Sequence, residues 1–213
     1  MIFRLDERIL FPDPELAEED GLLAVGGDLS AGRLLLAYQN GIFPWYSDDE
    51  PILWYSPHER FVLYPDELKV SKSMRRVLSS GTFNVTTDKC FAEVITACSV
   101  MEREGQDGTW ITAGMQTAYI ELHRLGYAHS VEVWQQDNLV GGLYGVQIGK
   151  VFCGESMFSR VSDASKTALI YLCNTGLFSL IDCQVHTAHL ESMGARMISR
   201  VAYAAALQDG QLP

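Results

Sequence analysis

Apolar positions follow two spacings along the chain, and each spacing predicts a different kind of element. Apolar residues three and four positions apart predict helices over residues 71–79, 91–98, 113–125, 162–173 and 187–194, with an Ala-rich helix after residue 199. Alternation of apolar and polar residues predicts strands over 83–86, 130–134, 139–147, 150–158, 179–185 and 196–199. Connections at 135–138 and 148–149 are too short for parallel crossovers, so three of these strands form an antiparallel meander. Thr87 or Asp88 is the expected cap of the helix at 91–98, and residues 104–108 are expected to form a loop.

The first third of the chain lacks this regularity. A turn at residues 26–30 leads into one helix, which Asp28 or Ser30 caps and which ends near Asn40. Two aromatic segments follow, and Pro and an acidic tip interrupt them. We therefore expect a small N-terminal domain over residues 1–64 and a second domain over residues 65–213. Helices before and after a mainly antiparallel sheet make the fold class α+β.

Composition and charge narrow the class of protein. The 213 residues are 47% hydrophobic, which suits a packed interior, and no apolar run approaches the roughly 18 residues of a membrane span. The N-terminus is charged from Arg4 onward, so we expect a soluble protein without a secretion signal. The five cysteines are odd in number and scattered through apolar patterns, which is typical of reduced thiols in a cytoplasmic protein.

The net charge of −11 argues against a protein that coats nucleic acid, because that affinity comes from neutralising phosphates. The charge is uneven, however. Residues 1–67 carry 14 of the 27 acidic residues and 4 of the 16 Lys and Arg, a net charge of −10. The remainder carries 13 acidic against 12 basic residues, so a local basic face there could still meet a polyanion.

Two polar residues stand out in the strand predicted at 179–185. Alternation places Asp182 and Gln184 on one face, and Cys183 on the other. Either the carboxylate and the amide satisfy each other as a structural pair, or they act on a substrate. If Asp182 holds the NH2 group of Gln184, the carbonyl oxygen of Gln184 can accept a hydrogen bond from an incoming amine. With no strong base present, the carbonyl compound attacked by that amine would need to be activated already.

A second candidate is an acid in the middle of another predicted strand. Alternation over residues 150–158 places Cys153, Glu155 and Met157 on one face, and Gly154 leaves space for a close approach of backbone or ligand. Glu155 is either a functional acid or the partner of Arg160 or Lys166 in a structural ion pair.

Other kinds of site are less well supported. Cys183, His186 and His189 suggest a metal site, but Cys183 points away from Asp182 and the two histidines fall at a capped helix start, whereas zinc needs three or four ligands of fixed geometry. Ser156 does not lie in a Gly-x-Ser-x-Gly motif. We expect no metal and no enzyme nucleophile.

Aromatic and basic residues offer a surface for nucleic acid. Loop tryptophans often pack without further function, but Trp45, Trp54 and Trp110, with Tyr38 and Tyr119, could stack on nucleobases. Four basic residues fall on or just before one predicted helix. They form either a solvated face or a phosphate contact, and they are Lys69, Lys72, Arg75 and Arg76.

Eight short segments together resemble the leucyl/phenylalanyl-tRNA–protein transferase family, in the expected order and across nearly the whole chain. They are residues 21–30 (GLLAVGGDLS), 41–45 (GIFPW), 54–57 (WYSP), 108–111 (GTWI), 141–145 (GGLYG), 152–159 (FCGESMFS), 164–168 (ASKTA) and 181–185 (IDCQV). Each segment alone is weak, and their joint occurrence is specific. The resemblance implies a small N-terminal domain followed by an acetyltransferase-like (GNAT) domain.

The resemblance also implies an activity and its partners. Leu or Phe, with Met as a further donor to consider, would move from aminoacyl-tRNA to the N-terminal Arg or Lys of a protein and mark it for degradation through the N-degron route. The aminoacyl ester is activated already, so the enzyme mainly positions the acceptor amine and assists proton loss. No cofactor is expected, and the protein would act as a cytoplasmic monomer that binds tRNA weakly.

Carried over to this chain, the family's roles fall on residues already noted. Asp182 would polarise Gln184, Gln184 would accept a hydrogen bond from the attacking amine, and Glu155 would hold an amino group. Met157 and Leu143, the latter at a position where Met is common, would line a pocket for a side chain unbranched at its β-carbon. The residues that would hold the terminal adenosine are Trp45, Trp110, Phe152, Tyr38 and Tyr119. The basic set Lys69, Lys72, Arg75 and Arg76 would touch the acceptor stem.

Two other classes of protein are compatible with parts of this pattern. An acyl-CoA acyltransferase of the same fold would carry a Gln/Arg-x-x-Gly-x-Gly/Ala loop before a helix, and the sequence has none. A non-catalytic binding module would not require Asp182 and Gln184 on one face. Replacement of Gln184 by Ala separates an enzyme from a binding module, because only the enzyme would lose its activity while keeping its fold.

Overall fold

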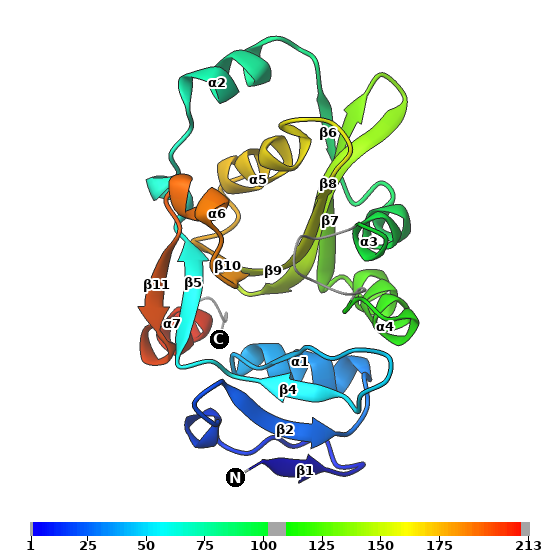
Figure 1. Cartoon of the computed structure of the whole chain (residues 1–213), viewed down its shortest axis with the longest axis vertical. Helices are drawn as coiled ribbons and strands as arrows, with labels where there is room; N and C mark the ends of the chain where they lie inside the picture. The colour runs from blue at the N-terminus through cyan, green and yellow to red at the C-terminus, as the bar shows by residue number, and fades with distance from the viewer. Residues whose placement is uncertain (1, 102–109, 210–213) are drawn as a thin grey trace.

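The protein is built from a small and a large β-sheet with helices around them. Its structure, a computed structural model, describes residues 2–101 and 110–209, so the loop expected over 104–108 lies outside the described residues. The small sheet has the order β1-β2-β4-β3. Its strands are β1 (Phe3–Leu5), β2 (Leu22–Gly26), β3 (Phe43–Pro44) and β4 (Leu53–Tyr55). Helix α1 (Ala31–Gln39) lies beside this sheet at one end of the molecule (Figure 1).

The large sheet has seven strands in the order β11-β5-β10-β9-β8-β7-β6. They are β5 (Glu59–Leu63), β6 (Asn84–Thr87), β7 (Ala128–Gln135), β8 (Asn138–Ile148), β9 (Val151–Ser159), β10 (Leu180–Gln184) and β11 (Arg196–Ser199). The meander β7-β8-β9 is antiparallel as predicted, and β10 pairs in parallel with β9 after a helical crossover. β5 precedes the expected domain boundary at residue 64 and pairs within the large sheet, between β10 and β11.

Helices cover both faces of the large sheet. Helix α5 (Ala164–Asn174) packs on one face, and α3 (Phe91–Ser99) with α4 (Ala113–Arg124) packs on the other (Figure 1). The remaining helices are α2 (Lys72–Ser79), α6 (Ala188–Ser192), α7 (Arg200–Asp209) and two 3-10 turns, Pro14–Leu16 and Pro65–Glu67. Among the described residues no helix is long and apolar enough to cross a membrane.

Local sequence explains where most of these helices begin. Ser30 accepts the backbone N–H of Arg33 and Ser71 accepts that of Met74, as N-cap hydroxyls do. The expected cap of α3 is wrong. Residue Cys90 occupies the N-cap position without a side-chain bond, and Asp88 instead accepts the N–H of Ser130 from β7 at 2.8 Å. The Asp88 carboxylate, which the local pattern assigned to the helix N-terminus, thus forms a tertiary hydrogen bond to a strand instead.

Two β-bulges change which side chains share a face. The β8–β9 register shifts between the pairs Tyr144–Ser156 and Gly145–Gly154, which leaves Glu155 as an extra residue. Cys153 therefore joins the core on the α3 side and Met157 packs on the α5 side, so the prediction that Cys153, Glu155 and Met157 share one face is wrong. A second shift in β10 falls between Asp182 and Gln184, and the φ angle of Gln184 is +59°.

Candidate active site

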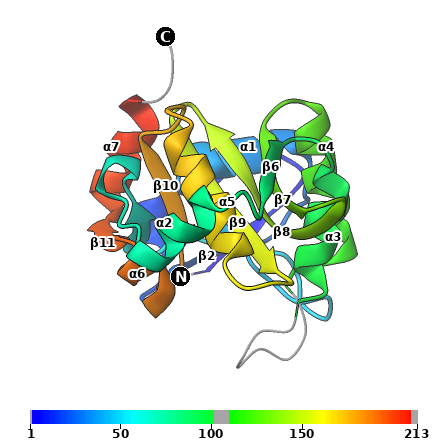
Figure 2. The ribbon, with the colours of Figure 1, turned by 90° about the horizontal axis from the view of Figure 1, so that it is seen from above.

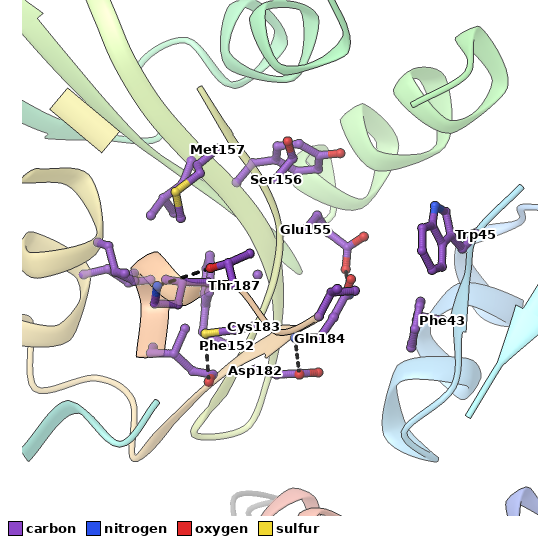
Figure 3. Close-up of a pocket in the computed structure, with 18 of the residues that line it drawn as sticks. Phe43, Trp45, Phe152, Glu155, Ser156, Met157, Asp182, Cys183, Gln184 and Thr187 are labelled. Atoms are coloured by element: carbon purple, nitrogen blue, oxygen red, sulfur yellow. Dashed lines mark hydrogen bonds between the residues drawn. The ribbon is translucent and has the colours of Figure 1, made fainter. Parts of the chain in front are cut away.

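A cavity of about 560 Å³ opens beside the end of β10, where the small sheet meets the large one. Strand β3 contributes Phe43, β9 contributes Glu155 and β10 contributes Gln184, while α5 and α6 close the opposite end (Figure 3). The two bulges open this space, because β9 and β10 pair only as far as Cys153 and Asp182 and then separate. Segments far apart in the sequence thus meet around one cavity.

The end of the cavity near α5 is apolar. Leu143 and Met157 face each other across the β8–β9 pair, and both line the cavity. The other apolar residues that line this end are Phe152, Leu169, Leu172 and Ile181. Phe152 is buried with its ring edge-on to Phe178, so it belongs to the apolar end and has no free face for an adenine, contrary to the implied role. This end suits an aliphatic or aromatic side chain.

The opposite end carries aromatic residues at its opening. Trp45 and Trp110 both line the cavity there, and Trp45 is 39% exposed, so an indole face is accessible to a planar ligand. Tyr38 and Tyr119 do not line the cavity. Both rings are buried, their hydroxyls bond to each other, and the Tyr119 hydroxyl donates to Glu155 at 3.2 Å. The implied adenosine contact is therefore wrong for these two tyrosines, which support Glu155 from behind.

Gln184 and Glu155 form the polar wall between the two ends. The side-chain Nε2 of Gln184 donates to Oε1 of Glu155 at 2.8 Å (Figure 3). An amide whose NH2 group is held in this way presents its carbonyl oxygen as an acceptor. The function expected of Gln184 is therefore geometrically possible, but Glu155 holds the amide rather than Asp182.

Glu155 is poised between two protonation states. Burial raises the pKa of its carboxyl to about 7, against the lowering effect of hydrogen bonds from Tyr38, Tyr119 and Gln184. The carboxylate form accepts from the Gln184 amide and predominates above this pH. Near neutrality the group can also take up a proton, which is typical of catalytic carboxyl groups.

Asp182 acts on the backbone of Gln184. Its Oδ1 accepts the Gln184 N–H at 2.9 Å, across the left-handed conformation of that residue. The predicted bond from Asp182 to the side-chain amide is wrong, because the bulge turns the amide toward β9. Asp182 is fully buried, and its remaining acceptor sites are taken by Arg60 and by the Tyr203 hydroxyl at 2.8 Å.

Arg60 is a site residue that the sequence interpretation missed. Its guanidinium pairs with Asp182, donates to the Gly41 carbonyl at 3.0 Å, and lies 4.7 Å and 4.6 Å from the ring centroids of Phe43 and Tyr203. Burial disfavours its charge, but the attraction of Asp182 outweighs this and raises the pKa of Arg60. Arg60 follows Glu59 at the start of β5 and precedes its apolar residues, so the local pattern resembles an exposed strand end and gives no sign of its burial.

The cavity wall offers no activated nucleophile among the described residues. Burial raises the pKa of the Cys183 thiol well above its ordinary value, so the thiolate is not formed near neutral pH. His186 lies 3.1 Å from Glu191, and no group of three or more possible metal ligands occurs among the described residues. The four basic residues, Lys69, Lys72, Arg75 and Arg76, are all exposed on or just before α2, outside this cavity.

Together these features fit one class of protein. An α+β fold whose cavity holds an amide against a carboxylate, between an apolar end and an indole-lined end, has the parts that an acyltransferase with an amine acceptor needs.

Comparisons with known proteins identify the family. Residues 62–208 match the model of the leucyl/phenylalanyl-tRNA protein transferase family, and residues 27–58 match the N-terminal domain of the same family. The chain belongs to this family and is an aminoacyltransferase. A leucyl/phenylalanyl-tRNA–protein transferase from Syntrophobacter fumaroxidans is 63% identical over 202 residues, which cover 93% of this chain and 86% of the relative. Another from Flavobacterium johnsoniae is 53% identical over 211 residues, covering 98% and 100%.

Solved structures show a more distant similarity. A GCN5-related N-acetyltransferase from Kribbella flavida has a TM-score of 0.38 and 8% sequence identity, over 78% of this chain and 60% of that one. The α+β class itself follows from the sheet order and helix placement described above.

Proposed function

We propose that the enzyme transfers Leu or Phe from aminoacyl-tRNA to the N-terminal Arg or Lys of an acceptor protein, in the cytoplasm and as a monomer. The observation that supports this most directly is the side-chain amide of Gln184, held by Glu155 on the wall of a cavity with one apolar and one aromatic end. An aminoacyl-adenosine has matching parts: an apolar side chain, an ester, and a base that can stack.

The aminoacyl side chain enters the end lined by Leu143 and Met157. A side chain that branches only at its γ-carbon, or an aromatic one, keeps its bulk at this apolar end. A side chain branched at its β-carbon places a methyl group next to the ester instead, which disfavours Val and Ile. The adenine stacks on Trp45 or Trp110, and such stacking contributes about 1–3 kcal/mol per base.

The acceptor amine attacks the ester carbonyl carbon from the side of Gln184. As the nitrogen–carbon bond forms, the bond from the carbonyl carbon to the ribose oxygen breaks, and the ribose oxygen takes up the proton that the amine loses. The carbonyl oxygen of Gln184 accepts a hydrogen bond from the amine and orients its lone pair. Glu155 holds the amide in place and draws an amino group into the site.

Asp182, Arg60 and Tyr203 act as positioning residues. They do not contact the acceptor amine, because the Asp182 carboxylate is fully buried and its oxygens already accept hydrogen bonds from Arg60 and Tyr203. Their effect reaches Gln184 through its backbone N–H, which keeps the residue in the left-handed conformation that aims the amide at Glu155.

The acceptor preference is supported by charge. Residues 1–67, which carry a net charge of −10, include the small sheet that forms one wall of the cavity. A chain beginning with Arg or Lys brings two positive charges, so this acidic part of the protein favours its approach. The marked product then enters N-degron degradation.

The test compares two acceptor peptides, one with a free N-terminal Arg and one with an acetylated Arg, in the presence of labelled Phe-tRNA or Leu-tRNA. Label should enter only the free-amine peptide, and Gln184→Ala should abolish incorporation while circular dichroism shows an intact fold. Labelling of neither peptide, with acylation of some amine by acetyl-CoA instead, would refute the proposal.

A further inference from the structure

A second cavity, of about 250 Å³, lies next to the active-site cavity between three helices. Residues from α2, α5 and α6, and from the segment before α2, line it. Figure 2 shows these three helices close together on the same side of the molecule. Of its lining residues only Lys69 belongs to the basic set noted in the sequence, and the cavity itself has no role assigned so far in the transfer reaction.

The charge of this cavity is opposite to that of the whole protein. Its lining includes Lys69, Lys166 and His189, with hydroxyls from Ser71 and Ser192, and none of its nine lining residues is acidic. The chain as a whole carries a net charge of −11. Two ammonium groups, an imidazole and two hydroxyls around one space form a donor set that suits a tetrahedral oxyanion with several acceptor atoms.

Asp163 pairs with one of these cations and leaves most of the positive charge in place. Asp163 accepts from Lys166 Nζ at 3.0 Å but does not line the cavity, and the Lys166 side chain remains 40% exposed. A lysine has three donors, so Lys166 can contact Asp163 and an anion together. Lys69 is exposed, and its backbone N–H donates to Met193, which fixes the segment at the rim.

His189 connects the two cavities. It lines both of them, from the short helix α6 whose Leu190 also contacts the aminoacyl pocket. Burial and the nearby charge of Lys166 lower the pKa of His189, while Asp163 opposes this change. The imidazole is therefore mostly neutral in the free protein, and an anion in the second cavity would favour its protonated form.

The exposed basic side chains of α2 continue from this cavity. Lys72, Arg75 and Arg76 follow Ser71 along the helix, so a cationic strip leads away from the cavity rim. A strip of this kind suits a chain of phosphates rather than one isolated anion.

We propose that this second cavity, formed by Lys69, Lys166 and His189, binds a backbone phosphate of the donor RNA. The site binds the RNA at a point separate from the aminoacyl-adenosine. This inference rests on the proposed function. Helix α6 carries His189, which lines both cavities, and Leu190, which lines the active-site cavity. Binding of the phosphate therefore stabilises the position of a helix that also forms part of the active-site cavity.

The first test separates the phosphate site from the transfer reaction. Transfer is measured with charged tRNA and with the minimal donor phenylalanyl-adenosine, which has no phosphate, for the wild type and for Lys166→Gln. Lys150→Gln is the matched control, because Lys150 is an exposed lysine in the β8–β9 turn. For Lys166→Gln we expect a rise of about tenfold in KM for charged tRNA. The salt dependence of log KM should fall in slope by about 1, and the ratio of the two donors should shift in favour of the adenosine ester.

The outcomes are distinct. If the wild type uses neither donor, the proposed function fails. If the wild type uses both and Lys166→Gln behaves like Lys150→Gln with charged tRNA, the phosphate site is refuted while the proposed function stands. An equal loss with both donors would also refute the site, because it would indicate a general structural defect.

A second test measures the site directly. The His189 imidazole is titrated by nuclear magnetic resonance in chloride, in inorganic phosphate and with a short oligoribonucleotide, at constant ionic strength. We expect its pKa to rise with phosphate and with the oligoribonucleotide, and the rise to disappear in Lys166→Gln. A rise with inorganic phosphate alone would replace the RNA with free phosphate as the ligand, and no rise with either would refute the site.

Discussion

The backbone of Gln184 provides a way to separate stability from chemistry. Its φ of +59° lies in the left-handed region, which costs a residue with a side chain about 1–2 kcal/mol and costs glycine little. We therefore predict that Gln184→Gly is more stable than Gln184→Ala, although both variants lose transfer because both lack the amide.

The size of this difference follows from two opposing effects. Glycine avoids the left-handed cost of about 1–2 kcal/mol but loses about 0.5–1 kcal/mol through the greater freedom of its unfolded chain. The net advantage of Gly over Ala is about 0.5–1 kcal/mol. Loss of the hydrogen bond to Glu155 is common to both variants and cancels in the comparison.

Urea unfolding followed by tryptophan fluorescence measures the difference, and single-turnover transfer to an Arg peptide measures the chemistry. Gln136 is a matched control: it is an exposed glutamine in the β7–β8 turn with a φ of +55°. Gln136→Gly should likewise be more stable than Gln136→Ala, and both variants should transfer at the wild-type rate.

Two results would refute this reasoning. Equal or reversed stability at position 184, with the expected order at 136, would mean that Asp182 does not hold Gln184 in the left-handed conformation. Substantial transfer by either 184 variant would show that the amide does not assist the amine.

Three further predictions concern other parts of the site. The pKa of Glu155 is raised from 4.5 to about 7 in the folded protein, so its contribution to stability is fully present below about pH 4.5 and is lost as the pH rises to about 7. Glu155→Gln should remove about 3 kcal/mol of this pH dependence of the unfolding free energy in urea titrations. An unchanged pH dependence would contradict the raised pKa of Glu155. Trp45→Ala should raise KM for charged tRNA by a factor corresponding to about 1–3 kcal/mol and Trp45→Phe by less, whereas equal KM values would exclude stacking there. Leu143→Ala enlarges the apolar end of the cavity, so it should lower the unfolding free energy by about 2–5 kcal/mol. It should also raise the ratio of kcat/KM for Phe-tRNA to that for Leu-tRNA, and a fall in this ratio would show that the aminoacyl side chain binds elsewhere.

Much of the fold could be predicted because its signals are local. The meander of β7, β8 and β9 follows from alternation and short turns, and the start of α2 follows from Ser71. Candidate residues could also be found locally, since Glu155 and Gln184 are polar groups within apolar strands. Both line one cavity, but alternation could not show that the Glu155 carboxylate, rather than Asp182, holds the Gln184 amide.

The errors all arise from tertiary structure. Alternation assumes one residue per position along a ladder, and the bulge at Glu155 and the shift after Asp182 each break that assumption. Tyr38 and Tyr119 are residue types that often stack on nucleobases, but in this fold they pack beneath Glu155 and both rings are buried. No short-range pattern encodes the burial of a ring by segments far away in the chain.

The amino-acid sequence alone therefore specified the α+β class, most of the elements, the family resemblance and the polar residues of the wall, because each depends on neighbours within a few positions or on joint short motifs. Only the tertiary structure decided that Glu155 orients Gln184 and that Asp182 serves the backbone. Arg60 meets Asp182 across 122 positions of sequence. Such contacts depend on how the strands align and where they bulge, and that alignment is set by packing of the whole sheet.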